Sequence, residues 1–112
     1  MDTLQPEESR ENKVAARLAQ SAAQFFENES NRQSLITVTR AVLSSDGLHA
    51  TIFLSILPES AEESVMSFAR RNRTELREYI KKNLPIARIP TFDVEIDHGE
   101  KHRQHIDELL RS

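Results

Sequence analysis

Apolar side chains recur every three to four residues over roughly residues 10–31, which is the repeat of an amphipathic helix. Residues 34–43 are rich in β-branched side chains, which fit a pleated strand better than a helix. Residues 44–47 supply serine, aspartate and glycine for a tight reversal, and apolar alternation returns over residues 48–57. The pattern predicts a helix followed by an antiparallel hairpin. The apolar positions of the helix are Val14, Leu18, Ala22, Phe25 and Phe26.

Helical spacing returns over residues 59–84, after Pro58 and with acidic residues at the start, where the positive end of a helix dipole favours them. The dense polar run at residues 70–74 predicts a kink that divides this stretch into two helices. Residues 85–90 begin and end with proline, which cannot continue a helix, so they predict an extended connector. Residues 91–97 alternate apolar with acidic side chains, which is typical of a strand with one wet face.

The predicted fold class is α+β, a two-layer sandwich in which helices cover one face of a three-stranded sheet. The order is helix, strand, strand, helix, kink, helix, strand, and Ile106, Leu109 and Leu110 add a short C-terminal helix. We expect the phenylalanines in the core, and the uncovered sheet face to stay largely wet. These two groups are Phe25, Phe26, Phe53, Phe68 and Phe92 for the core, and Thr37, Thr39, Thr51 and Ser55 for the wet face.

Length and composition narrow the class of protein. With 112 residues the chain has room for one domain, which we assign to residues 10–112, after a mobile N-terminal tail at residues 1–9. The chain has no cysteine, which excludes disulfides and thiolate chemistry. It shows neither a signal-peptide pattern nor an apolar run long enough to cross a bilayer, so we expect a cytoplasmic protein without membrane contact.

The formal net charge of -3 hides an uneven distribution. Residues 70–88 hold seven basic side chains against two acidic ones, whereas acidic residues dominate the first thirty positions. Such a cationic patch can follow the phosphates of a nucleic acid. It can equally be a solvated helix face whose basic residues balance Glu75 and Glu78. The candidate RNA-binding residues are Arg70, Arg71, Arg73, Arg77, Lys81, Lys82 and Arg88.

Three segments form a series along the chain. They are Arg10-x-x-Lys13-Val14-Ala15 in the first predicted helix, residues 36–50 in the hairpin, and Pro90-x-Phe92-x-x-x-x-Asp97 with Ile106-x-x-Leu109-Leu110 after it. In this order and spacing they resemble the bacterial ribosome-binding factor A family, over nearly the whole chain.

The resemblance implies a type II KH-like fold and a ribosome biogenesis factor. Such a factor binds the small ribosomal subunit and its ribosomal RNA, and supports late small-subunit maturation and rRNA processing. It implies no enzymatic activity, cofactor or small-molecule substrate, and we expect a monomer. Second-tier candidates for RNA contact are Arg10, Lys13, Arg17 and Arg40.

Two features depart from the family's pattern. Asn72, Arg73 and Thr74 stand where the family commonly has an alanine-glycine pair at the kink between the helices. Gly99 stands farther from the terminal leucines than the family's glycine does. Separately, the Gly-x-x-Gly loop of RNA-gripping KH domains is missing, because Gly47 and Gly99 are the only glycines.

Two further groups of residues have the spacing of chemical sites. His98, His102 and His105 are spaced like metal ligands on a helix, and Asp93, Glu95 and Asp97 share one side of a strand. We expect no metal site and no catalysis, because no nucleophile or phosphate-binding loop accompanies them. We expect a wet strand face instead. From the charge asymmetry we also expect the acidic strand and the acidic N-terminal segment to limit nonspecific adhesion to RNA and to favour its release.

Two other classes of protein stay open at this point. One is a KH-like protein-interaction module that does not bind RNA and uses the exposed edge of the hairpin for docking. The other is a metal-dependent nuclease, which a chelator would inactivate. RNA binding differs from an edge-strand interface in its steep dependence on salt.

Overall fold

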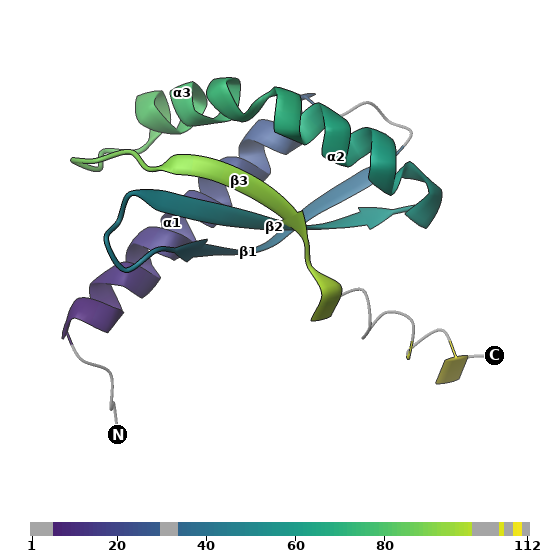
Figure 1. Cartoon of the computed structure of the whole chain (residues 1–112), viewed down its shortest axis with the longest axis horizontal. Coiled ribbons are helices and arrows are strands. Elements are labelled where there is room, and N and C mark those ends of the chain that lie inside the picture. The colour runs from purple at the N-terminus through teal and green to yellow at the C-terminus, as the bar shows by residue number, and fades with distance from the viewer. Residues whose placement is uncertain (1–5, 30–33, 100–105, 107–108, 111–112) are drawn as a thin grey trace.

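The computed structural model describes residues 6–29, 34–99, 106 and 109–110. Its element order confirms the predicted α+β class, with the helices and the sheet shown in Figure 1. The predicted terminal helix at residues 106–110 lies mostly outside the described residues. The elements are α1 (Pro6–Glu29), β1 (Leu35–Leu43), β2 (His49–Leu57), a single 3₁₀ turn η1 (Glu59–Ala61), α2 (Glu62–Arg71), α3 (Arg73–Asn83) and β3 (Thr91–Ile96).

The three strands form one sheet with β2 at its centre. β1 runs antiparallel to β2, with Leu35 opposite Leu57, and the turn between them contains Gly47 at a φ of 73°. β3 runs parallel to β2, with His49 opposite Thr91. A parallel neighbour requires a crossover connection, which η1, α2 and α3 supply. The crossover places α2 and α3 alongside β3 (Figure 1).

Helix α1 begins at Pro6, earlier than the boundary after residue 9 expected from the sequence. Proline suits the first position of a helix, because the N–H that it lacks would have no intrahelical partner there and its fixed φ is already helical. Residues 6–9 thus belong to helix α1, whereas the sequence predicted them to be part of the N-terminal tail.

The hydrophobic core lies between the helices and one face of the sheet. Phe25, Phe26 and Phe92 are buried in it as predicted, and Phe68 is partly buried against its edge. The core residues are Leu18, Ala22, Phe25, Phe26, Ala50, Ile52, Leu54, Ile56, Val65, Met66, Ala69, Leu76, Ile80, Phe92 and Val94.

The prediction for Phe53 was wrong, and a β-bulge explains its surroundings. Phe53 lies on the face of β2 away from the helices, because Ile52 and Leu54 occupy the core face. The ladder between β1 and β2 shifts between Val38 and Arg40, so that Arg40 pairs with Phe53. In a regular ladder Thr39 would pair with Phe53, and Arg40 would share the core face with Val38. The Arg40 guanidinium instead lies 3.9 Å from the centroid of the Phe53 ring.

The prediction that the uncovered face of the sheet is largely wet was wrong for part of this face, because buried polar side chains lie on it. Ser55 and Asp97 are each only 8% exposed. The Thr39 hydroxyl donates to Asp97 Oδ2 at 2.6 Å, and Arg40 Nε lies 3.4 Å from the same oxygen. Since Asp97 follows β3 while Thr39 belongs to β1, these contacts join the two outer strands across β2. Of the predicted wet positions, Thr37 is exposed, and Thr39 and Thr51 are half-buried.

The predicted kink between α2 and α3 is confirmed at Asn72. Asn72 has a φ of -106° and a ψ of 22°, which does not require glycine. Its side-chain amide donates to the carbonyl of Phe68 at 2.8 Å, and its backbone N–H donates to the carbonyls of Phe68 and Ala69. These bonds satisfy carbonyls at the end of α2 and allow the bend without the alanine-glycine pair.

No helix in the described part of the chain is long and apolar enough to span a membrane.

Candidate nucleic-acid interface

The seven predicted RNA-binding residues lie on α2, α3 and the connector that leads to β3. Arg70 and Arg71 end α2, and α3 carries the next four. Arg88 follows in the connector. All of them are exposed except Arg77, which is half-buried. The structure divides the seven residues into two groups that differ in their partners.

The first group contacts β3 and the residues before it. Arg73 Nη1 lies 2.9 Å from Asp93 Oδ1, and Arg70 Nη2 lies 3.7 Å from Glu95 Oε2. All four side chains are about half exposed, so each ion pair contributes only about 0–1 kcal/mol to stability. The pairs nevertheless reduce the charge that the two guanidinium groups present to a phosphate.

Arg77 extends this group toward the start of β3. Its Nε donates to the carbonyl of Pro90 and its Nη2 donates to the carbonyl of Ile89, both at 3.2 Å. We call Arg70, Arg73 and Arg77 the β3 clamp, because each connects the α2–α3 pair with β3 or its approach. The side chains of these three arginines are thus engaged in contacts within the protein.

The second group consists of Arg71, Lys81, Lys82 and Arg88, which we call the unpaired cations. Within the described residues none of these four side chains has a hydrogen-bond or ion-pair partner. Lys81 and Lys82 lie in the last turn of α3, immediately before the connector that carries Arg88. These side chains can reach phosphates without first breaking an internal contact. They are the part of the predicted set best suited to bind RNA.

The second-tier basic residues lie elsewhere. Lys13 and Arg17 are exposed on α1, and Arg40 is held over Phe53 and against Asp97. The side chain of Arg10 lies outside the described part of the structure. Arg40 is therefore engaged in contacts within the protein, on the uncovered face of the sheet.

The three carboxylates of the last strand have separate environments. Asp93 and Glu95 are exposed and pair with the β3 clamp, whereas Asp97 is buried against Thr39 and Arg40. Sequence alternation placed all three on one side of the strand but gave no indication that Asp97 is buried. Each of the three carboxylates thus has a basic partner on another element.

The histidine series falls mostly outside the described structure. His98 is exposed, and His102 and His105 are not among the described residues. Over residues 13–28, 34–99, 106 and 109–110, no group of three or more histidine, cysteine, aspartate or glutamate side chains is arranged to hold a metal ion.

Comparison with known proteins adds to this geometry. Residues 10–110 match the family model described as Ribosome-binding factor A. The ribosome-binding factor A of Beutenbergia cavernae is 29% identical over 107 residues, covering 92% of this chain and 67% of that protein. The protein of the same name from Renibacterium salmoninarum is 33% identical over 78 residues, covering 68% of this chain and 53% of its own length.

Solved structures show the same fold. The crystal structure of ribosome-binding factor A from Thermus thermophilus aligns with a TM-score of 0.69 at 20% identity, covering 77% of this chain and 93% of that one. A homology model of the Thermus thermophilus factor, fitted into a cryo-EM map of a 30S complex of that factor, aligns with a TM-score of 0.67 at 20% identity. It covers 76% of this chain and 92% of that one.

Proposed function

Because the chain belongs to the ribosome-binding factor A family, we propose that it binds the small ribosomal subunit through ribosomal RNA and supports late subunit maturation and rRNA processing. The related Thermus factor in a 30S complex supports the choice of the small subunit as partner. The single observation that carries RNA contact is the set of unpaired cations on α2, α3 and the connector.

The mechanism is binding and release without catalysis. The unpaired cations contact phosphates, which positions the protein on folded RNA without reading bases. No Gly-x-x-Gly loop is available to clamp a single strand, since Gly47 lies in the hairpin turn and Gly99 follows β3. We therefore propose recognition of the shape and charge of the subunit by a monomer that needs no cofactor.

The test is co-sedimentation of the purified protein with free small subunits across a salt series. We predict that binding weakens steeply with salt, and that Lys81→Gln with Arg88→Gln weakens binding further. The slope of log affinity against log salt should fall by roughly 0.7 to 0.9 for each phosphate that the variant no longer neutralises. Both side chains are exposed and unpaired within the described structure, so the protein should keep its fold.

The control is Lys13→Gln with Arg17→Gln, which removes the same charge from α1. Equal weakening by the two double variants would mean that binding is not specific to the α3 surface, because either net charge or RNA contact by Lys13 and Arg17 on α1 would account for it. Failure of the native protein to sediment with subunits at any salt concentration would contradict the proposed function.

A protein-interaction module that docks at the sheet edge is the second candidate. β1 is an outer strand, and its Leu35 and Val42 are 61% and 45% exposed. The bulge at Thr39 interrupts the ladder of β1, and bulges of this kind hinder pairing with another strand. Binding to subunits that does not respond to salt would favour this candidate.

A further inference from the structure

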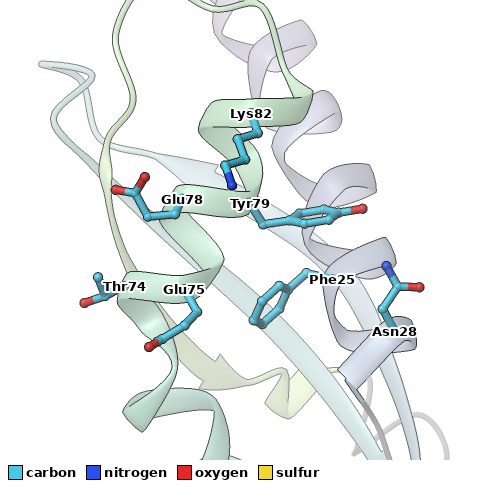
Figure 2. Close-up of a pocket in the computed structure, with 7 residues that line it drawn as sticks. All are labelled: Phe25, Asn28, Thr74, Glu75, Glu78, Tyr79 and Lys82. Carbon is cyan, nitrogen blue, oxygen red and sulfur yellow. The ribbon is translucent and has the colours of Figure 1, made fainter.

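A pocket of about 380 Å³ lies between the C-terminal part of α1 and the outer side of α3. No residue of the β3 clamp lines it, and Lys82 is the only unpaired cation that does. Figure 2 shows the lining side chains, two from α1 and five from α3. They are Phe25, Asn28, Thr74, Glu75, Glu78, Tyr79 and Lys82.

Two aromatic rings form the apolar part of this pocket. The ring centroids of Phe25 and Tyr79 are 5.7 Å apart, with the rings tilted by 56°. Phe25 also packs edge-to-face on Phe26 in the core, at 5.3 Å. The Tyr79 hydroxyl donates to Gln24 Oε1 at 3.3 Å, which connects α3 with α1. These contacts hold the rings in place before any ligand arrives.

The charge of the pocket is the opposite of that on the unpaired cations. Glu75 and Glu78 are exposed, and within the described structure neither carboxylate has an ion-pair partner. Lys82 is the one basic side chain among the lining residues, so two negative charges face one positive charge. Such a site repels phosphate and attracts a cation.

We propose that this pocket binds an arginine side chain of a basic polypeptide segment. A guanidinium group stacks on an aromatic face and forms paired hydrogen bonds with a carboxylate, so it suits Tyr79 together with Glu75. The Glu78 side chain points away from both rings (Figure 2) and adds only to the negative charge of the lining. An ammonium group lacks the planar stacking surface. The occupant is therefore protein, on a site that shares only Lys82 with the unpaired cations, and this inference does not depend on ribosome binding.

The test is an NMR titration of the free, ¹⁵N-labelled protein with the peptide acetyl-Leu-Arg-Leu-amide. We expect shift changes centred on Phe25, Asn28, Glu75, Glu78 and Tyr79, and no such changes with acetyl-Leu-Gln-Leu-amide. Glu75→Gln should lower the affinity for the arginine peptide roughly two- to fivefold, as expected for an exposed ion pair. Glu63→Gln is the control, since Glu63 is an exposed acidic residue in the first turn of α2.

Lys82→Gln separates peptide from RNA as the occupant. It removes the one positive charge in the pocket, so it should strengthen binding of the arginine peptide and weaken binding of RNA. The inference is overturned if the arginine peptide leaves the pocket resonances unchanged or shifts residues over the whole surface. It is also overturned if single-stranded oligouridylate, and not the peptide, produces the shifts at Phe25 and Tyr79. None of these outcomes requires the small subunit. The titration therefore tests the pocket alone, and co-sedimentation tests the proposed function.

Discussion

At the scale of single residues, Asp97 shows how a residue in the family's closing motif acts through the fold. Its carboxylate accepts a hydrogen bond from Thr39 and lies next to Arg40, which in turn covers Phe53. Removing the partner of a buried carboxylate strongly destabilises the folded protein, because the remaining charge is left without compensation. The residue therefore stabilises the sheet.

Asp97→Asn should lower the free energy of unfolding by about 1–3 kcal/mol, because it removes a charged acceptor from a buried group of hydrogen bonds. Asp93→Asn is the control, with a side chain that is 57% exposed compared with 10% for Asp97. Its exposed ion pair should contribute less than about 1 kcal/mol. Urea denaturation measures both, and equal losses of stability in the two variants would rule out the special role of Asp97.

At the scale of elements, the β3 clamp adds polar contacts between the helical pair and the last strand. Arg77 is its central member, because it satisfies two backbone carbonyls just before β3 while remaining half-buried. Arg70 and Arg73 add exposed ion pairs further along the strand. A substitution at Arg77 will change the stability of the fold as well as the charge, so Arg77 is a poor probe of RNA contact.

Arg77→Met should lower the free energy of unfolding by about 1–3 kcal/mol, because it removes charged donors from the carbonyls of Ile89 and Pro90. Lys81→Met, one turn further along α3, should change it by no more than about 0.5 kcal/mol. Thermal unfolding followed by circular dichroism compares the two variants. A stability loss at Lys81 as large as that at Arg77 would contradict the division between the clamp and the unpaired cations.

At the scale of the whole molecule, carboxylates of β3 form ion pairs with arginines of α2 and α3. The sequence predicted that Asp93 and Glu95 form an acidic face apart from the basic residues. In the structure they instead pair with Arg73 and Arg70. In the proposed function, their effect is to limit how many cations are available to RNA. The net charge of -3 hides both this pairing and the exposed cations that remain.

Asp93→Asn together with Glu95→Gln should therefore tighten binding to small subunits and steepen its salt dependence, because two arginines gain freedom to contact phosphates. Glu75→Gln with Glu78→Gln makes the same change in net charge at the pocket between α1 and α3. Co-sedimentation compares the two double variants at several salt concentrations. An identical gain in both would show that net charge matters and the local pairing does not.

The sequence by itself determined the class of the fold, the order of the elements and most of the core. Helical repeats and strand alternation are written into neighbouring residues, so Leu18, Phe26 and Ile52 could be assigned to the core without knowing what they contact. The kink at Asn72 and the position of the cationic region were also predicted. Pro6 was assigned to the wrong side of the first boundary because proline occurs both in tails and at helix starts.

Only the tertiary structure decided which charges are paired and which surfaces remain. Arg73 meets Asp93 across 20 positions of sequence, and Thr39 meets Asp97 across 58, so no local pattern contains either contact. The bulge that turns Arg40 away from the core depends on how β1 pairs with β2, and the aromatic pocket depends on how α1 packs on α3. Side-chain pairing is set by distance in space, whereas the hydrophobic pattern reports only the face on which each residue lies.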